Sequence, residues 1–238
     1  EHVKVAKHRV NLPKTDSSFL FEKTRETDEN DIYFVSFLNC TFNIKYPKVP
    51  QEESINLLKT HINDFERELS SDSINLTDWI DVEDFVRYYW IQEFSKNIDG
   101  AFGRSIFITW EQGKIFKMGP VWDFDLAYGL GNERVMSSCD WYVRYQGWYK
   151  YLFKNETFRR RVKQYWTDNR EYFQDLIDSV NSASKILKTV SKSEFNRWPV
   201  LNNNKQWPFV DSYDNYDQSV NNLKTWIKNR IQWIDSHL

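Results

Sequence analysis

The chain has 238 residues and a formal net charge of −2, with hydrophobic residues at 40% and aromatic residues at 17%. This composition supports a sizeable core, and the low counts of 7 Gly and 6 Pro exclude a low-complexity chain. The balanced charge argues against the broad basic surface of a nucleic-acid-binding protein, so we expect no nucleic-acid partner. We interpret the short basic run at 159–161 as a solvated helix face.

The sequence shows no membrane span and no signal peptide. No apolar run reaches the roughly 20 residues that a spanning helix needs. The chain begins with Glu1 and His2, in a pattern that reads as the middle of a strand. We therefore expect a piece of a longer protein, with any localisation signal upstream, and the localisation itself stays unknown.

Cysteines and histidines give no pattern of a metal site. Cys40 and Cys139 are isolated, without CxxC spacing. We interpret them as buried small hydrophobic residues, with a disulfide or a nucleophile as the alternatives. The histidines are scattered and give no support for zinc chemistry: they are His2, His8, His61 and His237.

The residue pattern of the first fifty residues is typical of β-strands. Residues 3–5 alternate, 19–21 are a short apolar run, and 32–35 with 41–44 read as a strand pair. Pro47 and Pro50 then end the extended region.

Helical periodicity begins at Glu52. Apolar residues recur at three- and four-residue steps as far as Leu69, which predicts an amphipathic helix. Asp81 is the expected N-cap of a second, aromatic-rich helix, with Asp84 in its first turn and residues 85–94 as its body. A loop follows at 95–100.

A β-hairpin and further helices complete the chain. Residues 105–110 and 114–118 predict a hairpin with Gly113 in its turn, leading directly into residues 119–125. The remainder reads as helical, most clearly at 148–153, from 158 to about 180, and from 220 to the end. The apolar spacing of the last helix predicts that it docks against the body, and 198–208 is the longest irregular stretch.

Two acidic loops stand out because large apolar residues surround them. Asp99 follows the aromatic-rich helix, whereas Asp123 and Asp125 are interleaved with Trp122 and Phe124. Carboxylates embedded among such side chains are costly unless a cation or hydrogen-bond donors stabilise them. Two carboxylates at i and i+2 of an extended segment point to the same side, and Mg²⁺ prefers oxygen ligands.

The order helix, acidic loop, hairpin, acidic loop is also that of a protein-kinase catalytic centre, in which one Asp orients the acceptor hydroxyl and a second holds Mg²⁺. Structural roles are the alternative. Asp99 lies in a sequence suited to a turn. Asp123 and Asp125 could instead cap a helix or pair with Arg134 or Arg144.

At these residues the chain resembles the CotH (spore coat protein H) kinase-like family. The similarity lies in residues 97–99, in the Gly113-Lys114 turn, and above all in residues 119–129, which read GPVWDFDLAYG. The opening residues 1–11 and the segments 195–199 and 223–231 also fit, so the resemblance covers nearly the whole chain.

The resemblance implies an α+β, predominantly α-helical fold: the C-terminal lobe of an atypical protein-kinase-like fold with short antiparallel hairpins. Residues 1–50 would complete a truncated N-terminal lobe, and 51–238 would form a mainly helical C-terminal lobe, in one structural domain. It further implies ATP and Mg²⁺ or Mn²⁺ as cofactors and a protein Ser/Thr acceptor of unknown identity. Asp99 would be the catalytic acid, Asp123 a metal ligand, and Asp125 a second ligand or support.

The chain also departs from the family. The family's N-terminal region, which carries basic residues and phosphate contacts, has no match here, so we expect these residues alone to be inactive or nearly so. Export signals upstream in family members lead us to expect placement outside the cytoplasm. The alternatives are a degenerate kinase that serves as a scaffold and a surface module that grips a glycan or protein through the aromatic segment 141–149. Core packing would explain that segment equally well.

Overall fold

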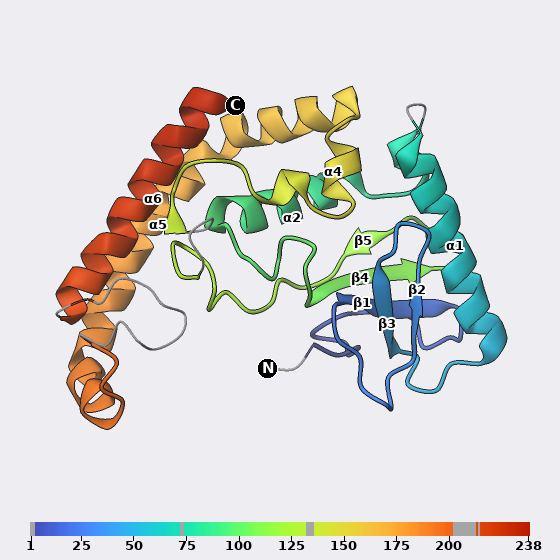
Figure 1. Cartoon of the computed structure of the whole chain (residues 1–238), viewed down its shortest axis with the longest axis horizontal. Helices are drawn as coiled ribbons and strands as arrows, with labels where there is room; N and C mark the ends of the chain where they lie inside the picture. Colours follow the sequence, from blue (N-terminus) through green and yellow to red (C-terminus); the bar gives the residue numbers. More distant parts are fainter. Residues whose placement is uncertain (1–2, 72–73, 132–135, 202–212, 214) are drawn as a thin grey trace.

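The computed structural model describes residues 3–71, 74–131, 136–201, 213 and 215–238. Within these ranges, strands form one antiparallel sheet at one end of the molecule (Figure 1), in the order β2-β3-β1-β4-β5. The strands are β1 (Ser18–Thr24), β2 (Tyr33–Val35), β3 (Thr41–Tyr46), β4 (Ile106–Glu111) and β5 (Lys117–Met118). The predicted pairing of 32–35 with 41–44 and the predicted hairpin are both confirmed, although β5 is shorter than expected. Residues 3–5 contribute only an isolated bridge, between Val5 and Val10.

The central strand β1 joins the two hairpins into one sheet. It pairs with β3 on one side and with β4 on the other. Phe19 faces Trp110 and Phe21 faces Ile108 across the β1–β4 ladder, and all four side chains are buried. Residues before position 50 therefore share a sheet with the hairpin that leads into the second acidic loop.

Aromatic side chains fill the core between the sheet and the helices. The helix α1 (Glu52–Ser70) buries the predicted apolar face, including Leu58, Ile62 and Phe65. Trp148 is fully buried against Phe65, and its Nε1 donates to the buried carboxylate of Glu66 at 2.7 Å. Burial raises the pKa of Glu66, and this carboxylate also accepts bonds from Ser36 and Leu38, so it is not left unpaired.

The helix α2 (Val82–Ser95) carries the chain to the first acidic loop. Its N-cap is Asp81 as predicted, because a carboxylate oxygen of Asp81 accepts from the main-chain N of Asp84 at 3.1 Å. The helix ends at Lys96, which adopts a left-handed conformation with φ 47°. The acidic loop therefore starts directly at a defined helix C-terminus.

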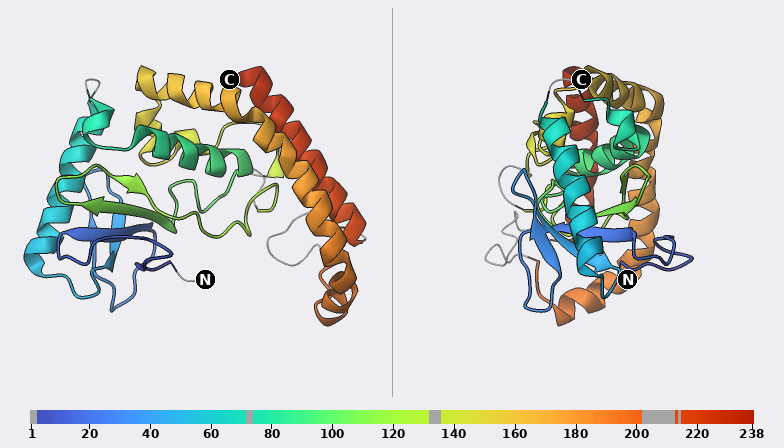
Figure 2. Two further views of the ribbon diagram at one scale, coloured as in Figure 1. Left: turned by 180° about the vertical axis from the view of Figure 1, so that it is seen from behind. Right: turned by 90° about the vertical axis from the view of Figure 1, so that its right-hand side faces the viewer.

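Two long helices pack side by side at the end opposite to the sheet (Figure 2), with α2 between them and the sheet. They are α5 (Glu156–Arg197) and α6 (Tyr216–His237), and the short segments η1 (Leu76–Asp78), η2 (Val143–Tyr145) and α4 (Tyr149–Leu152) complete the helical part. The predicted docking of the last helix is confirmed, since Trp226, Ile227 and Ile231 are buried. The helix α5 continues far beyond residue 180, and of the predicted irregular stretch, residues 202–208 lie outside the described part.

The α+β class with a predominantly helical composition is confirmed. The prediction for the cysteines holds only for Cys40, which is buried, because Cys139 is exposed; both are free thiols. Burial raises the pKa of Cys40 to about 11. None of the described helices combines the length and the apolar character that a membrane span requires.

Candidate functional site

The two acidic loops lie against each other and are joined by hydrogen bonds. The Nδ2 of Asn97, in the first loop, donates to the main-chain oxygen of Asp123 at 2.9 Å. Main-chain bonds add to this contact on both sides of Asn97: Tyr128 N donates to Ser95 O at 2.7 Å and Ile98 N to Leu126 O at 3.2 Å. Two segments separated by the whole β4–β5 hairpin therefore meet at one place.

Asp99 is held in a tightly packed turn. Its residue surface is only 9% exposed, and its main-chain N donates to Asn97 Oδ1 at 3.2 Å. The next residue, Gly100, lies directly against the terminal amide of Gln92, so a Cβ at this position would force that amide to move. Arg104 Nε donates to Asp99 Oδ1 at 3.0 Å, whereas Oδ2 accepts no hydrogen bond from the residues that the structure describes.

Asp123 and Asp125 are exposed, which corrects the expectation that apolar residues enclose them. Asp123 has a left-handed backbone with φ 57°, so the segment is not regularly extended at this point. Its apolar neighbours divide between the core and the surface: Leu126 is buried, whereas Trp122 is only half-buried. The carboxylates therefore face outward from a loop whose anchor points are buried.

Asp125 and Asp99 both affect the carboxyl group of Asp123. The pKa of Asp123 is raised by burial first, then by a hydrogen bond with Asp125 and by the negative charges of Asp125 and Asp99. The hydrogen bonds of Asn97 bring the Asp99 loop and the Asp123 loop together. Within the described ranges, no group of three or more His, Cys, Asp or Glu side chains is arranged to hold a metal ion.

The oxygen ligands at this place nevertheless fit Mg²⁺. This ion is held in nucleotide-dependent enzymes by one or two carboxylates together with substrate phosphates and water, rather than by a cage of protein ligands. Asp123 and Asp125 would supply such a pair, since both are exposed carboxylates two residues apart in one loop.

Two arginines were the alternative partners proposed for these carboxylates, and the structure describes only Arg144. Arg134 is outside the described residues. Arg144 stacks over the Trp141 ring, with its guanidinium carbon 3.6 Å from the ring centroid, and also over Phe153. Among the described residues, Arg104 reaches the first acidic loop through its bond to Asp99, and sequence reasoning missed this arginine. Its position five residues after Asp99 in the same loop was the available signal.

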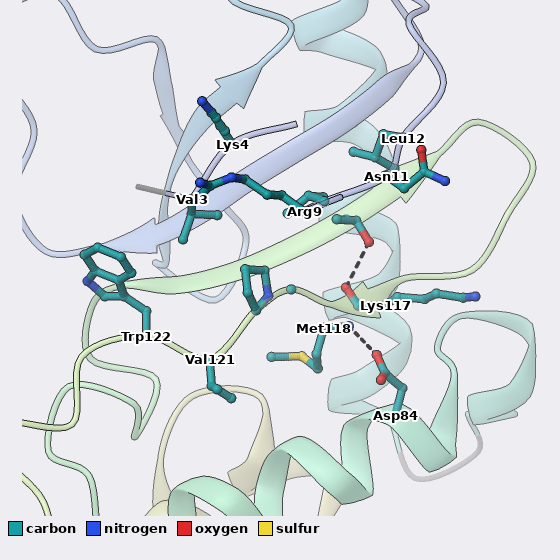
Figure 3. A pocket seen from close by; sticks show the side chains of 14 residues that line it. Val3, Lys4, Arg9, Asn11, Leu12, Asp84, Lys117, Met118, Val121 and Trp122 are labelled. Atoms are coloured by element: carbon teal, nitrogen blue, oxygen red, sulfur yellow. Dashed lines mark hydrogen bonds between the residues drawn. The ribbon is translucent and has the colours of Figure 1, made fainter. Parts of the chain in front are cut away.

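A cavity of about 580 Å³ adjoins the second acidic loop (Figure 3). The N-terminal segment contributes residues such as Val3 and Arg9, and the opposite wall contains Met118, Val121 and Trp122. Met118 is fixed there because its main-chain N donates to Asp84 Oδ2 at 2.7 Å. Trp122, the residue directly before Asp123, lines the cavity, whereas Asp123 and Asp125 are not among its lining residues. The sequence had given no nucleotide-contacting residues.

Comparison with known families identifies the chain. The sequence model of the family described as CotH kinase protein matches residues 10–234. The chain belongs to the CotH kinase protein family. The match contains both acidic loops and the hairpin between them, whereas residues 1–9, part of the predicted opening similarity, lie outside it. Searches of curated proteins and of solved structures found no match.

In this CotH kinase family member, the segment after the acidic pair is held by buried cations. Lys96 Nζ donates to the main-chain oxygens of Ser137 and Cys139 at 2.8 and 2.6 Å. Arg230, from α6, donates to the oxygens of Ser138 and Asp140 and to Glu93, and both Arg230 and Glu93 are fully buried. The C-terminal helix α6 therefore ties residues 138–140, which follow the acidic loop in the chain, to Glu93 of α2.

The CotH motif glycine Gly129 has a packing role. Its φ is 90°, and a Cβ placed on it would lie 2.8 Å from the Trp226 ring. Trp226 Nε1 in turn donates to Met136 O at 2.8 Å. The close approach of α6 to the acidic loop thus needs a residue without a side chain at position 129.

Proposed function

We propose that this chain carries the catalytic and metal-binding carboxylates of a protein kinase, which transfers the γ-phosphoryl group of ATP to a Ser or Thr hydroxyl of an acceptor protein. The hydrogen-bonded junction between the Asp99 loop and the Asp123 loop, in a member of the CotH kinase family, is the observation that carries the proposal. Phosphoryl transfer depends mainly on positioning and charge neutralisation, which this junction can provide.

Each carboxylate has a proposed role. Asp99 accepts the hydrogen bond of the acceptor hydroxyl through Oδ2, while Arg104 holds Oδ1 and fixes the orientation of the group. Asp123 and Asp125 hold Mg²⁺ or Mn²⁺, Asp123 as the principal ligand. The bound ion would neutralise phosphate charge. Asn97 keeps the two loops in register.

The cavity beside Trp122 is the proposed site for the nucleoside part of ATP. Apolar side chains of Val3, Met118 and Val121 offer a surface for a planar base. Its volume of about 580 Å³ is in the range of small-molecule sites. From there the phosphates would extend toward Asp123.

The competing function as an aromatic binding module has less support. Within the segment 141–149, Trp148 and Tyr149 are fully buried, and only Tyr145 is exposed over more than half of its surface, at 61%. Most of these aromatic side chains therefore belong to the core. The other alternative is a scaffold that keeps the fold but transfers no phosphate. A measurement of activity distinguishes it from a kinase.

The test is transfer of labelled γ-phosphate from ATP to a generic acceptor protein, with Mg²⁺ or Mn²⁺. Because the family's N-terminal phosphate contacts have no match here, we expect the full rate from a longer parent and little from these 238 residues alone. Asp123→Asn should abolish labelling, and Asp99→Asn should lower the rate by about 10²–10⁴-fold. Asp64→Asn, on the exposed face of α1, is the matched control and should keep the rate. A folded parent that neither labels an acceptor nor binds ATP would contradict the proposal.

A further inference from the structure

A site made of three carboxylates raises the question of which cation meets the transferred phosphate. Asp99, Asp123 and Asp125 all repel a phosphoryl group, and one divalent ion neutralises only part of the charge of ATP. We propose that Arg104 binds the phosphoryl group during transfer, next to Asp99. This inference rests on the function proposed above and adds a phosphate-binding residue to it.

Arg104 has free donors at the right place. Of its five N–H groups, the Nε–H makes the 3.0 Å bond to Asp99 Oδ1. Its terminal amino groups make no hydrogen bond with the described residues, and its side chain is 44% exposed, against 12% for Asp99. The guanidinium is thus anchored at one edge and open to a ligand at the other.

Arg104 is joined to the acidic loops through Asp99, to which its Nε donates a hydrogen bond. Its pKa is raised by the hydrogen bond to Asp99 and by the negative charges of Asp99, Glu26 and Asp123. Because Arg104 is bonded to Asp99, and Asn97 joins the Asp99 loop to Asp123, Arg104 lies near the proposed path from the metal ligand to the acceptor hydroxyl. This path is where the transferred group must pass.

The loop that carries Arg104 is held from several sides. The main-chain N atoms of Gly103 and Arg104 both donate to Asp99 O at 3.2 Å. Lys23 Nζ, from β1, donates to Gly103 O at 2.6 Å. Phe102 is buried and packs against Trp148, which fixes the other side of the turn. Arg104 is therefore preorganised relative to Asp99 rather than carried on a loose surface loop.

Arginine is suited to this role for chemical reasons. Its planar guanidinium keeps its charge at all relevant pH values and can give two parallel hydrogen bonds to phosphate oxygens. One edge can stay on Asp99 while the terminal amino groups bind the phosphate. In that arrangement, a single residue both orients the acceptor-binding carboxylate and stabilises charge on the transferred group.

A purely structural ion pair is the competing explanation, and a second pair in the molecule supplies the control. Arg161 donates from Nε to Glu83 Oε1 at 2.6 Å, and its side chain is 40% exposed, close to the value for Arg104. This pair joins α5 to α2 at the surface, and its charge partners do not include Asp99 or Asp123. Replacing Arg161 therefore removes a similar ion pair without touching the acidic site.

The experiment compares the binding of ATP and AMP in the presence of Mn²⁺, measured by calorimetry for wild type, Arg104→Gln, Arg104→Lys and Arg161→Gln. The two nucleotides share the base, ribose and α-phosphate, so their difference reports on the outer phosphates. We expect Arg104→Gln to weaken ATP binding by about 10- to 100-fold, the range for charge-assisted hydrogen bonds, and to leave AMP binding unchanged. Arg104→Lys should restore part of the loss, and Arg161→Gln should behave like wild type.

Three outcomes would overturn the inference while leaving the proposed kinase function intact. Equal weakening of ATP and AMP by Arg104→Gln would assign Arg104 a structural role. Unchanged ATP binding would remove it from the phosphate site, and an equal effect of Arg161→Gln would indicate general surface charge. A wild-type protein, including the longer parent, that binds neither nucleotide would instead contradict the proposed function, and the inference with it.

Discussion

Asn97 bridges the two acidic loops through both ends of its side-chain amide. Its Nδ2 donates to Asp123 O at 2.9 Å, and its Oδ1 accepts from Asp99 N at 3.2 Å. The residue is fully buried. The relative placement of the two carboxylates therefore depends on one amide group.

Replacing this amide should weaken both the fold and the proposed transfer. Asn97→Ala leaves the buried main-chain N of Asp99 and the main-chain O of Asp123 without the amide as partner, and we expect a loss of about 1–3 kcal/mol in the free energy of unfolding. Urea unfolding measures this loss, and the γ-phosphate assay should show a lower rate. Asn75→Ala is the control, because Asn75 also makes two side-chain hydrogen bonds but is exposed. Equal losses in the two variants would argue against a special role for Asn97.

The ion pair between Arg230 and Glu93 should contribute far more than the surface pair on the same helix. Arg230 is fully buried and donates to four oxygens, so Arg230→Met leaves Glu93 as an incompletely paired buried charge. We expect a loss of about 3–5 kcal/mol. Arg170→Met breaks the partly exposed pair with Asp235 and should cost about 0.2–1 kcal/mol. Urea unfolding of both variants measures the two losses in the free energy of unfolding, and losses of similar size would contradict this prediction.

Two glycines with left-handed backbones should respond differently to alanine. Gly129 and Gly113 have φ values of 90° and 77°, so both substitutions carry backbone strain of about 1–2 kcal/mol. A Cβ at Gly129 would also collide with Trp226, whereas a Cβ at Gly113 meets nothing within 4 Å. We expect Gly129→Ala to lose about 1–3 kcal/mol more than Gly113→Ala. Thermal unfolding of the two variants measures the difference in stability, and equal losses would show that Trp226 of α6 does not pack closely against residue 129.

Lys96 should make stability depend on pH in the alkaline range. Burial, and then the positive charge of Arg230, lowers the pKa of Lys96 from its usual 10.5 to about 8. Glu93, Asp140 and Cys139 act in the opposite direction and raise the pKa, but by less. Between these pH values the unfolded chain binds the proton and the folded chain releases it. The contribution of Lys96 to stability therefore rises with pH across this window and is lost as pH falls through about 8.

The variant Lys96→Gln removes this titration. The stability difference between wild type and variant should change in favour of wild type from about pH 8 to 10, with a slope of up to about 1.4 kcal/mol per pH unit. Urea unfolding at several pH values measures it, and the titration of all other groups largely cancels in the difference. Parallel pH profiles for the two proteins would contradict the prediction.

Local patterns in the sequence were sufficient for much of the secondary structure. The three- and four-residue spacing of apolar side chains predicted α1 and the docking face of α6, and Asp81 predicted the start of α2. These features depend on residues close together in the chain. The long extent of α5 was missed, because its second half is mostly exposed and carries little apolar periodicity.

For the candidate site, too, some features follow from the sequence and others only from the tertiary structure. The sequence alone determined which residue types stand in the acidic loops and that a hairpin separates them, since motif and order are properties of the chain. Only the tertiary structure decided that Asp123 and Asp125 are exposed, that Arg104 holds Asp99, and that Arg230 of α6 forms a buried ion pair with Glu93. The physical reason is that burial and ion pairing depend on which distant segments meet, and that is settled by packing of the whole core.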